Sequence, residues 1–378
     1  MKVALLNPAP PTYGGLSAET CCIGPAGYPP YNSRLGGLAS ILGDAGRKFH
    51  YVSDIGEVPT DADWVFTLLI PGYERFIASM MKWVKCKKAA FCVPPELAAA
   101  TEYGASFDSL IGADYIAAAG KLLGIRKVDQ YPQVKPHSLP PKPFIPWLNI
   151  SDGDCPSGCT YCSYSRKGPK EWRSPENTVK SLEVMYAPAS KVVRCPVYLA
   201  CPEIDLNKVW LRKFVALKNK SSVADIQIIT DCRADWMDDE VLELLVEAKT
   251  HEVIAALETP NKEILKVVDR RMDPLKYAAG YKKLRAAGIK VNCPVMFNLD
   301  DREDPEKVAA FCRAYEIVPN PGIMKYYASS RDWAKLKEWD MICEWPEPAE
   351  PLRTRKGVDV ALAKLAKFKE LMGLDHNG

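Results

Sequence analysis

Three closely spaced cysteines are the residues of this sequence with the clearest capacity for chemistry. They belong to the segment Cys155-Pro-Ser-Gly-Cys159-Thr-Tyr-Cys162. Three thiolates in so short a segment can ligate one metal centre, because Gly158 lets the backbone turn sharply around it. Since only three ligands are supplied locally, one iron of a four-iron cubane stays open to an exogenous ligand. The spacing therefore predicts a [4Fe-4S] cluster with these three cysteines as its metal ligands.

Zinc and a disulfide are the alternatives for this loop. A structural zinc site needs four ligands, so the fourth would have to come from a distant residue such as Cys195 or Cys201. A disulfide would leave one of the three thiols over and suits a reducing compartment poorly. The chain has 13 cysteines, and most stand singly among apolar neighbours, where they are expected to be small buried hydrophobes.

The composition is that of a globular protein and gives no electrostatic argument for a nucleic-acid partner. Of the 378 residues, 47% are hydrophobic and 26% charged, enough to bury a large core in two or three domains. The 50 basic and 47 acidic residues leave a formal net charge of +3, which indicates no strongly basic surface. No stretch approaches the roughly 18 unbroken apolar residues of a membrane span, and we expect a cytoplasmic protein.

Residues 1–130 alternate between strand and helix patterns. Strands are expected at 3–6, 49–52, 64–69 and 89–93, with a weaker signal at 115–118, and helices at 38–44 and 75–85. Strands separated by helices predict an α/β domain with a doubly wound parallel sheet of the Rossmann type. A ligand of such a sheet binds beyond the carboxyl ends of the strands.

A proline-rich stretch at residues 131–147 predicts a semi-rigid linker to a second domain. The alternation resumes over residues 148–327 with about six β/α units, the last strand being expected at 323–327. This pattern predicts a partial (β/α)6 barrel with its chemistry at the carboxyl ends of the strands. Residues 328–378 are expected to form a C-terminal tail with an amphipathic helix at 358–372. This tail could close over a substrate as a lid or simply pack against the barrel mouth.

The CxxxCxxC spacing, with aromatic Tyr161 directly before the last cysteine, resembles the signature of the radical S-adenosylmethionine (SAM) superfamily. The resemblance implies that the amino and carboxylate groups of SAM chelate the open iron. It also implies a reductant such as flavodoxin or ferredoxin, whose electron leads to cleavage of SAM into a 5′-deoxyadenosyl radical that abstracts hydrogen from substrate. Cys155, Cys159 and Cys162 would then be catalytic as well as metal-binding.

Further segments resemble the same family in the same order along the chain. They are Thr230-Asp-Cys-Arg-Ala-Asp235, Ala255-Ala-Leu-Glu-Thr259, Val268-Asp-Arg-Arg271 and Leu284-Arg-Ala-Ala-Gly-Ile289. The resemblance implies that Tyr161, Glu203, Arg233 and Glu258 bind the cofactor, with Glu203 at the place of the family's SAM-amine motif. A surface salt bridge or a helix cap is the structural alternative for the charged residues.

The segment Asn298-Leu-Asp-Asp-Arg-Glu303 departs from the family, which has GLPGET at this place. Loss of both glycines changes the turn, so its role near the adenosine is open. The position still implies that Asn298 binds the cofactor.

The N-terminal domain resembles the start of the cobalamin-binding subgroup of radical SAM proteins. The resemblance is carried by Asn7-Pro8, Pro29-Pro-Tyr31, Leu35-Gly-Gly-Leu-Ala-Ser-Ile-Leu42 and Ala45-Gly46. It implies that the domain could bind cobalamin, with the free N–H groups of a helix opened by Gly36 and Gly37 holding an acidic group of the corrinoid. None of the four histidines lies in a DxHxxG motif, so no cobalt-ligating imidazole is predicted. The domain could also be a vestige.

The leading hypothesis is an enzyme that uses the deoxyadenosyl radical, with cobalamin as a further cofactor, to methylate or rearrange an unactivated carbon. Sulfur insertion by a methylthiotransferase is the alternative enzyme function. It needs a second cluster, for which Cys21, Cys22, Cys86 and Cys92 invite comparison, although a middle cysteine near residue 50 is missing. A redox-sensing iron–sulfur protein is the alternative from another class. The substrate stays open among small molecules, peptides and RNA.

Overall fold

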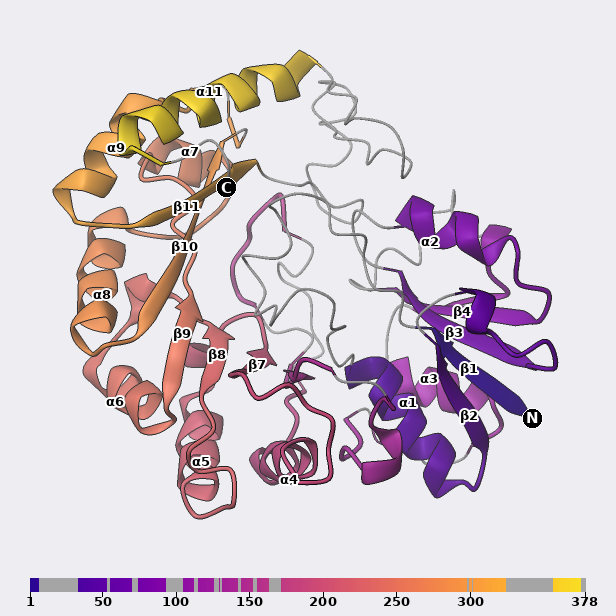
Figure 1. Ribbon diagram of the computed structural model, residues 1–378. Helices are drawn as coiled ribbons and strands as arrows, with labels where there is room; N and C mark the ends of the chain where they lie inside the picture. The colour runs from indigo at the N-terminus through magenta and orange to yellow at the C-terminus, as the bar shows by residue number, and fades with distance from the viewer. Residues whose placement is uncertain are drawn as a thin grey trace.

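Two parallel sheets, one in each half of the chain, form the frame of the protein (Figure 1). The computed structural model describes residues 1–6, 33–52, 55–69, 74–92, 105–111, 115–125, 129, 131–141, 144–151, 155–162, 171–297, 299–300, 302–323 and 356–374. In Figure 1 the N-terminal sheet lies at the opposite side of the molecule from the C-terminal sheet.

The N-terminal sheet has the strand order β2-β1-β3-β4-β5, and its strands pair in parallel. The strands are β1 (Lys2–Leu6), β2 (Lys48–Val52), β3 (Trp64–Leu69), β4 (Lys87–Cys92) and β5 (Ser109–Ile111). The helices around them are α1 (Ser33–Asp44), α2 (Glu74–Met81) and α3 (Tyr115–Leu122), with a 3-10 turn η1 at Ile55–Glu57.

Helices cover both faces of this sheet. Val3 and Leu5 of β1 pack with α1 and α3, whereas Ala4 and Leu6 of the same strand pack with α2. Successive side chains of a strand point to opposite faces, so this division places apolar contacts on each side. The doubly wound sheet predicted from the sequence is confirmed. Its strand order reverses between β1 and β3, the point at which such sheets bind ligands.

The strand expected at residues 115–118 is wrong, because Tyr115–Leu122 forms helix α3. Its alanine run has the highest intrinsic preference for helix. The fifth strand is instead β5, which has only three residues and lies at the edge of the sheet. A strand that short carries almost no periodic signal.

The C-terminal sheet has six parallel strands in the order β11-β10-β9-β8-β7-β6. They are β6 (Trp147–Asn149), β7 (Val197–Ala200), β8 (Ile228–Asp231), β9 (Thr250–Ile254), β10 (Lys290–Phe297) and β11 (Pro319–Ile323). The helices that follow along the chain are α4 (Pro175–Met185), α5 (Lys208–Lys218), α6 (Asp239–Glu247), α7 (Lys262–Val267), α8 (Pro274–Ala286), α9 (Pro305–Ala314) and α11 (Lys356–Met372). The partial barrel of six β/α units is confirmed.

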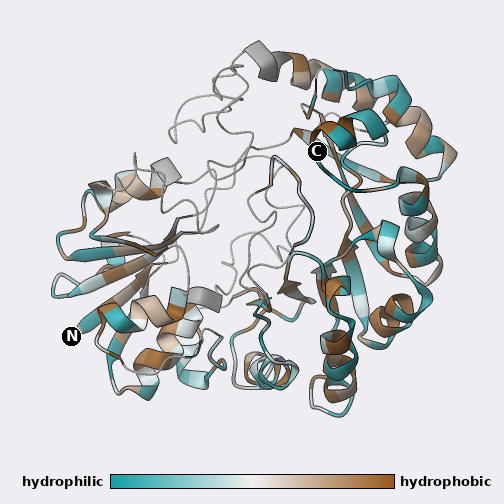
Figure 2. Ribbon diagram, turned by 180° about the vertical axis from the view of Figure 1, so that it is seen from behind, coloured by the Kyte–Doolittle hydropathy of each residue, from teal (hydrophilic) through white to brown (hydrophobic). Residues whose placement is uncertain are grey.

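Side-chain caps explain why the barrel helices start near the predicted residues. Asp238 accepts a hydrogen bond from the N–H of Val241, and Asp304 accepts from the first turn of α9. Such caps satisfy N–H groups that have no partner within the helix. The helices carry hydrophobic and hydrophilic residues on the same ribbon, as expected of helices with one buried face (Figure 2).

The last strand, β11, lies at 319–323 rather than at the expected 323–327. Its prolines, Pro319 and Pro321, made the segment look like a turn. Proline is tolerated here because β11 is an edge strand that pairs with β10 alone.

The C-terminal helix α11 packs on the outside of the barrel end. The ring of Phe368 lies 5.0 Å from the ring of Phe297, and Phe368 is fully buried. Residues 324–355 lie outside the described residues, so the lid expected of the tail stays a prediction. Within the described ranges, no helix combines the length and apolarity that crossing a bilayer requires.

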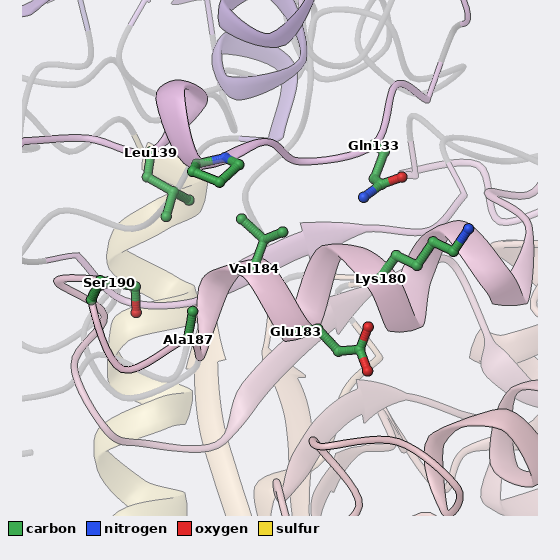
Figure 3. Close-up of a pocket in the computed structure, with 9 residues that line it drawn as sticks. Gln133, Leu139, Lys180, Glu183, Val184, Ala187 and Ser190 are labelled. Carbon is green, nitrogen blue, oxygen red and sulfur yellow. The ribbon is translucent and has the colours of Figure 1, made fainter.

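The linker contacts both halves of the chain. The Tyr51 hydroxyl donates to the carbonyl of Ser138 at 2.7 Å, and the N–H of Val134 donates to Ser181 of α4 at 3.1 Å. A pocket of about 380 Å³ opens between the linker and α4, with Gln133 and Leu139 on one wall and Lys180 and Glu183 among the residues of α4 (Figure 3). It lies apart from the carboxyl ends of the strands.

A single added methyl group at Gly280 is expected to destabilise the barrel. A Cβ there would meet the carbonyl oxygen of Ala234 at 1.8 Å, so α8 can approach the 3-10 turn η6 (Ala234–Trp236) only because position 280 has no side chain. We predict that Gly280→Ala lowers the free energy of unfolding by about 2 kcal/mol or more. Thermal melts followed by circular dichroism measure the change.

The control is Ala279→Ser on the exposed face of the same helix. It should change stability by less than about 0.5 kcal/mol. Equal melting temperatures for Gly280→Ala and Ala279→Ser would contradict the close approach of α8 to η6.

Candidate active site at the carboxyl ends of the barrel strands

The cysteine loop follows β6, at the carboxyl edge of the C-terminal sheet. Cys159 is buried, whereas Cys155 and Cys162 are partly exposed. The N–H of Cys162 donates to the carbonyl of Cys159 at 3.2 Å, and the N–H of Thr160 donates to the carbonyl of Val268 at 2.9 Å. The second bond fixes the loop to the end of α7. Burial raises the pKa of the Cys155 thiol, so the thiolate form of a metal ligand needs compensating positive charge beside it.

No three His, Cys, Asp or Glu side chains in the described part of the chain lie close enough to hold a single metal ion. In a four-iron cubane each thiolate binds a different iron, so the ligands need not converge on one point. The ligands of a four-iron cluster therefore differ from those of a structural zinc site, in which four side chains converge on one metal ion.

Tyr161 connects the cysteine loop to the carboxyl end of β9. Its hydroxyl donates to Oε1 of Glu258 at 3.1 Å and accepts from Nη1 of Arg270 at 3.4 Å. The same Nη1 lies 4.0 Å from Sγ of Cys159 and 3.7 Å from Oε1 of Glu258. A buried ion pair therefore lies against one of the predicted cluster ligands.

Glu258 is held in an uncommon backbone conformation at this place. Its φ of 61° is in the left-handed region, which residues other than glycine rarely adopt. Bonds on both sides fix it, because its N–H donates to the carbonyl of Pro294 at 2.9 Å and its carbonyl accepts from Met296 at 2.8 Å. Burial raises the pKa of its carboxyl group. Its second oxygen, Oε2, is buried without a hydrogen-bond partner.

Arg233 is buried, and its guanidinium is engaged by the protein. It donates to both oxygens of Asp235, at 2.9 and 2.7 Å, and stacks 4.2 Å from the ring of Trp236. It also donates to the hydroxyl of Ser157 in the cysteine loop at 2.8 Å and to the carbonyl of Arg271 at 2.5 Å. These contacts hold the cysteine loop in place through Arg233. The contact of Arg233 with the cofactor, which the family resemblance implies, stays a prediction.

Three carboxyl groups lie at the carboxyl ends of β7 and β8. Burial raises the pKa of Asp205 to about 6 and that of Asp231 to about 7. The pKa of Glu203 is raised well above its ordinary value by burial and by the neighbouring Asp205. Asp231 accepts from the hydroxyl of Tyr198, whereas Oδ2 of Asp205 is buried without a partner. Such a group of buried acids favours a ligand that brings a positive charge or hydrogen-bond donors.

Asn298 lies outside the described residues, so its cofactor contact stays a prediction. The described part of the same segment holds a buried carboxyl group, Glu303, whose Oε1 accepts from the hydroxyl of Thr259 at 2.8 Å. Its Oε2 has no partner. Burial raises the pKa of Glu303 to about 7. Thr259 directly follows Glu258, so this pair connects the ends of β9 and β10.

The structure thus brings Tyr161, Glu258 and the cysteine loop together. Glu203 lies close enough to the loop for its charge to add to the effect of burial in raising the pKa of the Cys155 thiol. Sequence analysis gave no role to Arg270, Asp205 or Glu303. Arg270 could have been found, because it belongs to the family-like segment at 268–271. Only the fold shows that Asp205 and Glu303 are buried.

Residues 150–312 match the family model described as Radical SAM superfamily. The matched range includes the cysteine loop and the carboxyl ends of four of the six barrel strands, β7, β8, β9 and β10. The cofactors that this family implies are a [4Fe-4S] cluster and SAM. Comparison with curated protein sequences gives no match.

Solved structures of cobalamin-dependent radical SAM proteins resemble the chain in fold. The radical SAM methyltransferase TsrM from Kitasatospora setae, with cobalamin and a [4Fe-4S] cluster bound, has a TM-score of 0.64 and 13% identity, over 93% of this chain and 78% of TsrM. OxsB, a cobalamin-dependent SAM radical enzyme with aqua-cobalamin and SAM bound, has a TM-score of 0.60 and 13% identity, over 98% of this chain and 56% of OxsB. The expected likeness to this subgroup is confirmed at the level of the fold.

The buried Glu303 carboxyl makes stability depend on pH. Because its pKa is about 7 in the folded protein against 4.5 ordinarily, the folded state keeps a proton that the unfolded state loses between these values. Stability therefore falls as pH rises from about 4.5 to 7, by up to about 3 kcal/mol. We predict that Glu303→Gln, which can still accept from Thr259, raises the melting temperature at pH 8 and leaves it nearly unchanged at pH 5.

Melting curves at pH 5, 6, 7 and 8 measure this effect. The exposed Glu243→Gln is the control and should leave the pH dependence of wild type intact. A Glu303→Gln melting temperature that parallels wild type at every pH would contradict the burial of an uncompensated carboxyl group.

Proposed function

We propose that this chain is a radical SAM enzyme in which Cys155, Cys159 and Cys162 hold a [4Fe-4S] cluster that binds and cleaves SAM. The observation that carries the proposal is the set of unpartnered polar atoms around the three thiols. Oε2 of Glu258 and Oδ2 of Asp205 are buried acceptors without a donor, which is costly unless a ligand completes them. The amine and hydroxyl donors of SAM fit such acceptors.

The residues around the loop divide into those that hold SAM and those that hold the loop. Glu203 and Asp205 would accept hydrogen bonds from the amine of SAM, and Oε2 of Glu258 would accept from a further donor of SAM. Tyr161 and Arg233 fix the loop through their bonds to Glu258 and Ser157. Asn298 is proposed to bind the cofactor, as the family resemblance implies. When bound, the cluster and SAM together supply radical hydrogen abstraction.

The N-terminal sheet is proposed to bind cobalamin over the carboxyl ends of β1 and β3, where the strand order reverses. The fold likeness to TsrM and OxsB spans both sheets of this chain, which supports two cofactors in one protein. With cobalamin as methyl carrier, the reaction is methylation or rearrangement of an unactivated carbon. A small reductant protein supplies the electron, and the substrate binds between the two cofactors.

The first test is anaerobic reconstitution with iron and sulfide, followed by reductant, SAM and an assay for 5′-deoxyadenosine. We expect deoxyadenosine from wild type and only background from a variant with Cys155, Cys159 and Cys162 changed to alanine. Cys195→Ala is the matched control, because Cys195 is a partly exposed cysteine outside the loop. It should retain full cluster content and activity, whereas a zinc site completed by Cys195 would lose its metal.

A four-iron cluster that forms without any cleavage of SAM would contradict the radical assignment and favour a redox-sensing protein. Cobalamin is tested separately, by adding hydroxocobalamin during reconstitution and measuring retained corrinoid after gel filtration. Stoichiometric retention supports methyl transfer. Deoxyadenosine formation with no retained corrinoid would remove cobalamin from the proposal and leave the radical assignment intact.

A further inference from the structure

Arg270 carries a positive charge against the cysteine loop. Its Nη1 lies 4.0 Å from Sγ of Cys159 and 3.4 Å from the hydroxyl of Tyr161. The side chain is only 9% exposed, so little water screens its charge from the sulfur. The surrounding Tyr161 and Glu258 keep the guanidinium protonated despite its burial.

Both ends of this side chain are fixed. Nη2 donates to the carbonyl of Ala256 at 2.5 Å, just beyond β9. The backbone N–H of Arg270 donates to the carbonyl of Leu265 at 2.8 Å and so anchors the residue to α7. A guanidinium held at two points keeps a constant distance from Cys159, which a flexible surface cation does not.

We propose that Arg270 is a positioning residue that sets the reduction potential of the cluster, and that Glu258 opposes its effect. The inference rests on the proposed function, since it requires a cluster on Cys159. Reduction adds one electron to the cluster and no compensating proton, so a nearby fixed positive charge stabilises the reduced state. The carboxylate of Glu258, 3.7 Å from Nη1, destabilises it. Charges and hydrogen bonds around the ligating sulfurs are known determinants of cluster potential.

The two charges predict shifts of opposite sign. Replacing Arg270 by glutamine removes the positive charge and makes the potential more negative. Replacing Glu258 by glutamine makes it less negative, while its amide can still bond Tyr161. We expect Arg270→Gln to change the ratio of reduced to oxidised cluster at fixed potential by about tenfold, which corresponds to about 59 mV for one electron. Arg270→Lys keeps the charge and should restore most of the wild-type potential.

The matched control is the neighbouring Arg271, whose side chain is 71% exposed and pairs with Asp269. Arg271→Gln removes the same formal charge one residue away and should leave the potential unchanged because water screens that site. The measurement is an anaerobic spectroelectrochemical titration of the reconstituted proteins without SAM at pH 8. Analysis of iron and acid-labile sulfide confirms equal cluster content, because it does not depend on the fraction of clusters that is reduced.

Each outcome decides the inference. A negative shift for Arg270→Gln, with none for Arg271→Gln, supports it. An intact cluster with the wild-type potential in Arg270→Gln overturns it. If Arg270→Gln assembles no cluster, the Glu258→Gln variant decides, because a positive shift supports the charge pair and an unchanged potential overturns it. Failure of the wild-type protein to assemble any four-iron cluster would instead overturn the proposed function.

Discussion

Parallel pairing of the barrel strands is the constraint on which the site depends. Every strand of such a sheet ends at the same edge, so the residues that follow each strand meet although they are far apart in sequence. Cys155, Glu203, Arg233, Glu258 and Glu303 follow β6, β7, β8, β9 and β10 in that order. No two of them share a connecting loop. The strands lie in the sheet in the same order as in the sequence, so the residues that follow successive strands are neighbours at one edge and form one site.

The charges at this edge are only partly balanced within the protein. Two buried guanidinium groups at this edge have carboxylate partners, Asp235 for Arg233 and Glu258 for Arg270. Among the residues that the structure describes, none forms an ion pair with Glu203, Asp205 or Asp231, and burial raises the pKa of each. Removing acids from water without compensation costs stability. An arrangement of this kind is typical of a binding site, where the ligand completes what the fold leaves unsatisfied.

The sequence predicted the architecture well and the connections between side chains poorly, and the three cluster ligands stay a prediction. Strands and helices of the barrel were recognisable because capping residues such as Asp238 and Asp304 mark helix starts. The fifth strand of the N-terminal sheet was predicted where helix α3 lies, and β11 was predicted too far along the chain. A three-residue strand such as β5 and a proline-containing edge strand such as β11 have no clear periodicity. The resemblance placed Arg233 near the cofactor, but its bidentate bond to Asp235 depends on the local turn. Burial of Asp205 and Glu303 arises from tertiary packing, which spacing along the chain does not record.

The linker has a mechanical consequence. Because it bonds to Tyr51 on one side and to α4 on the other, it is poorly suited to act as a hinge. A change in the separation of the two sheets would therefore strain or break these bonds. Enzymes that close domains around a substrate adjust that separation at each cycle. Here the bonds that the linker makes with Tyr51 and with α4 oppose such a movement.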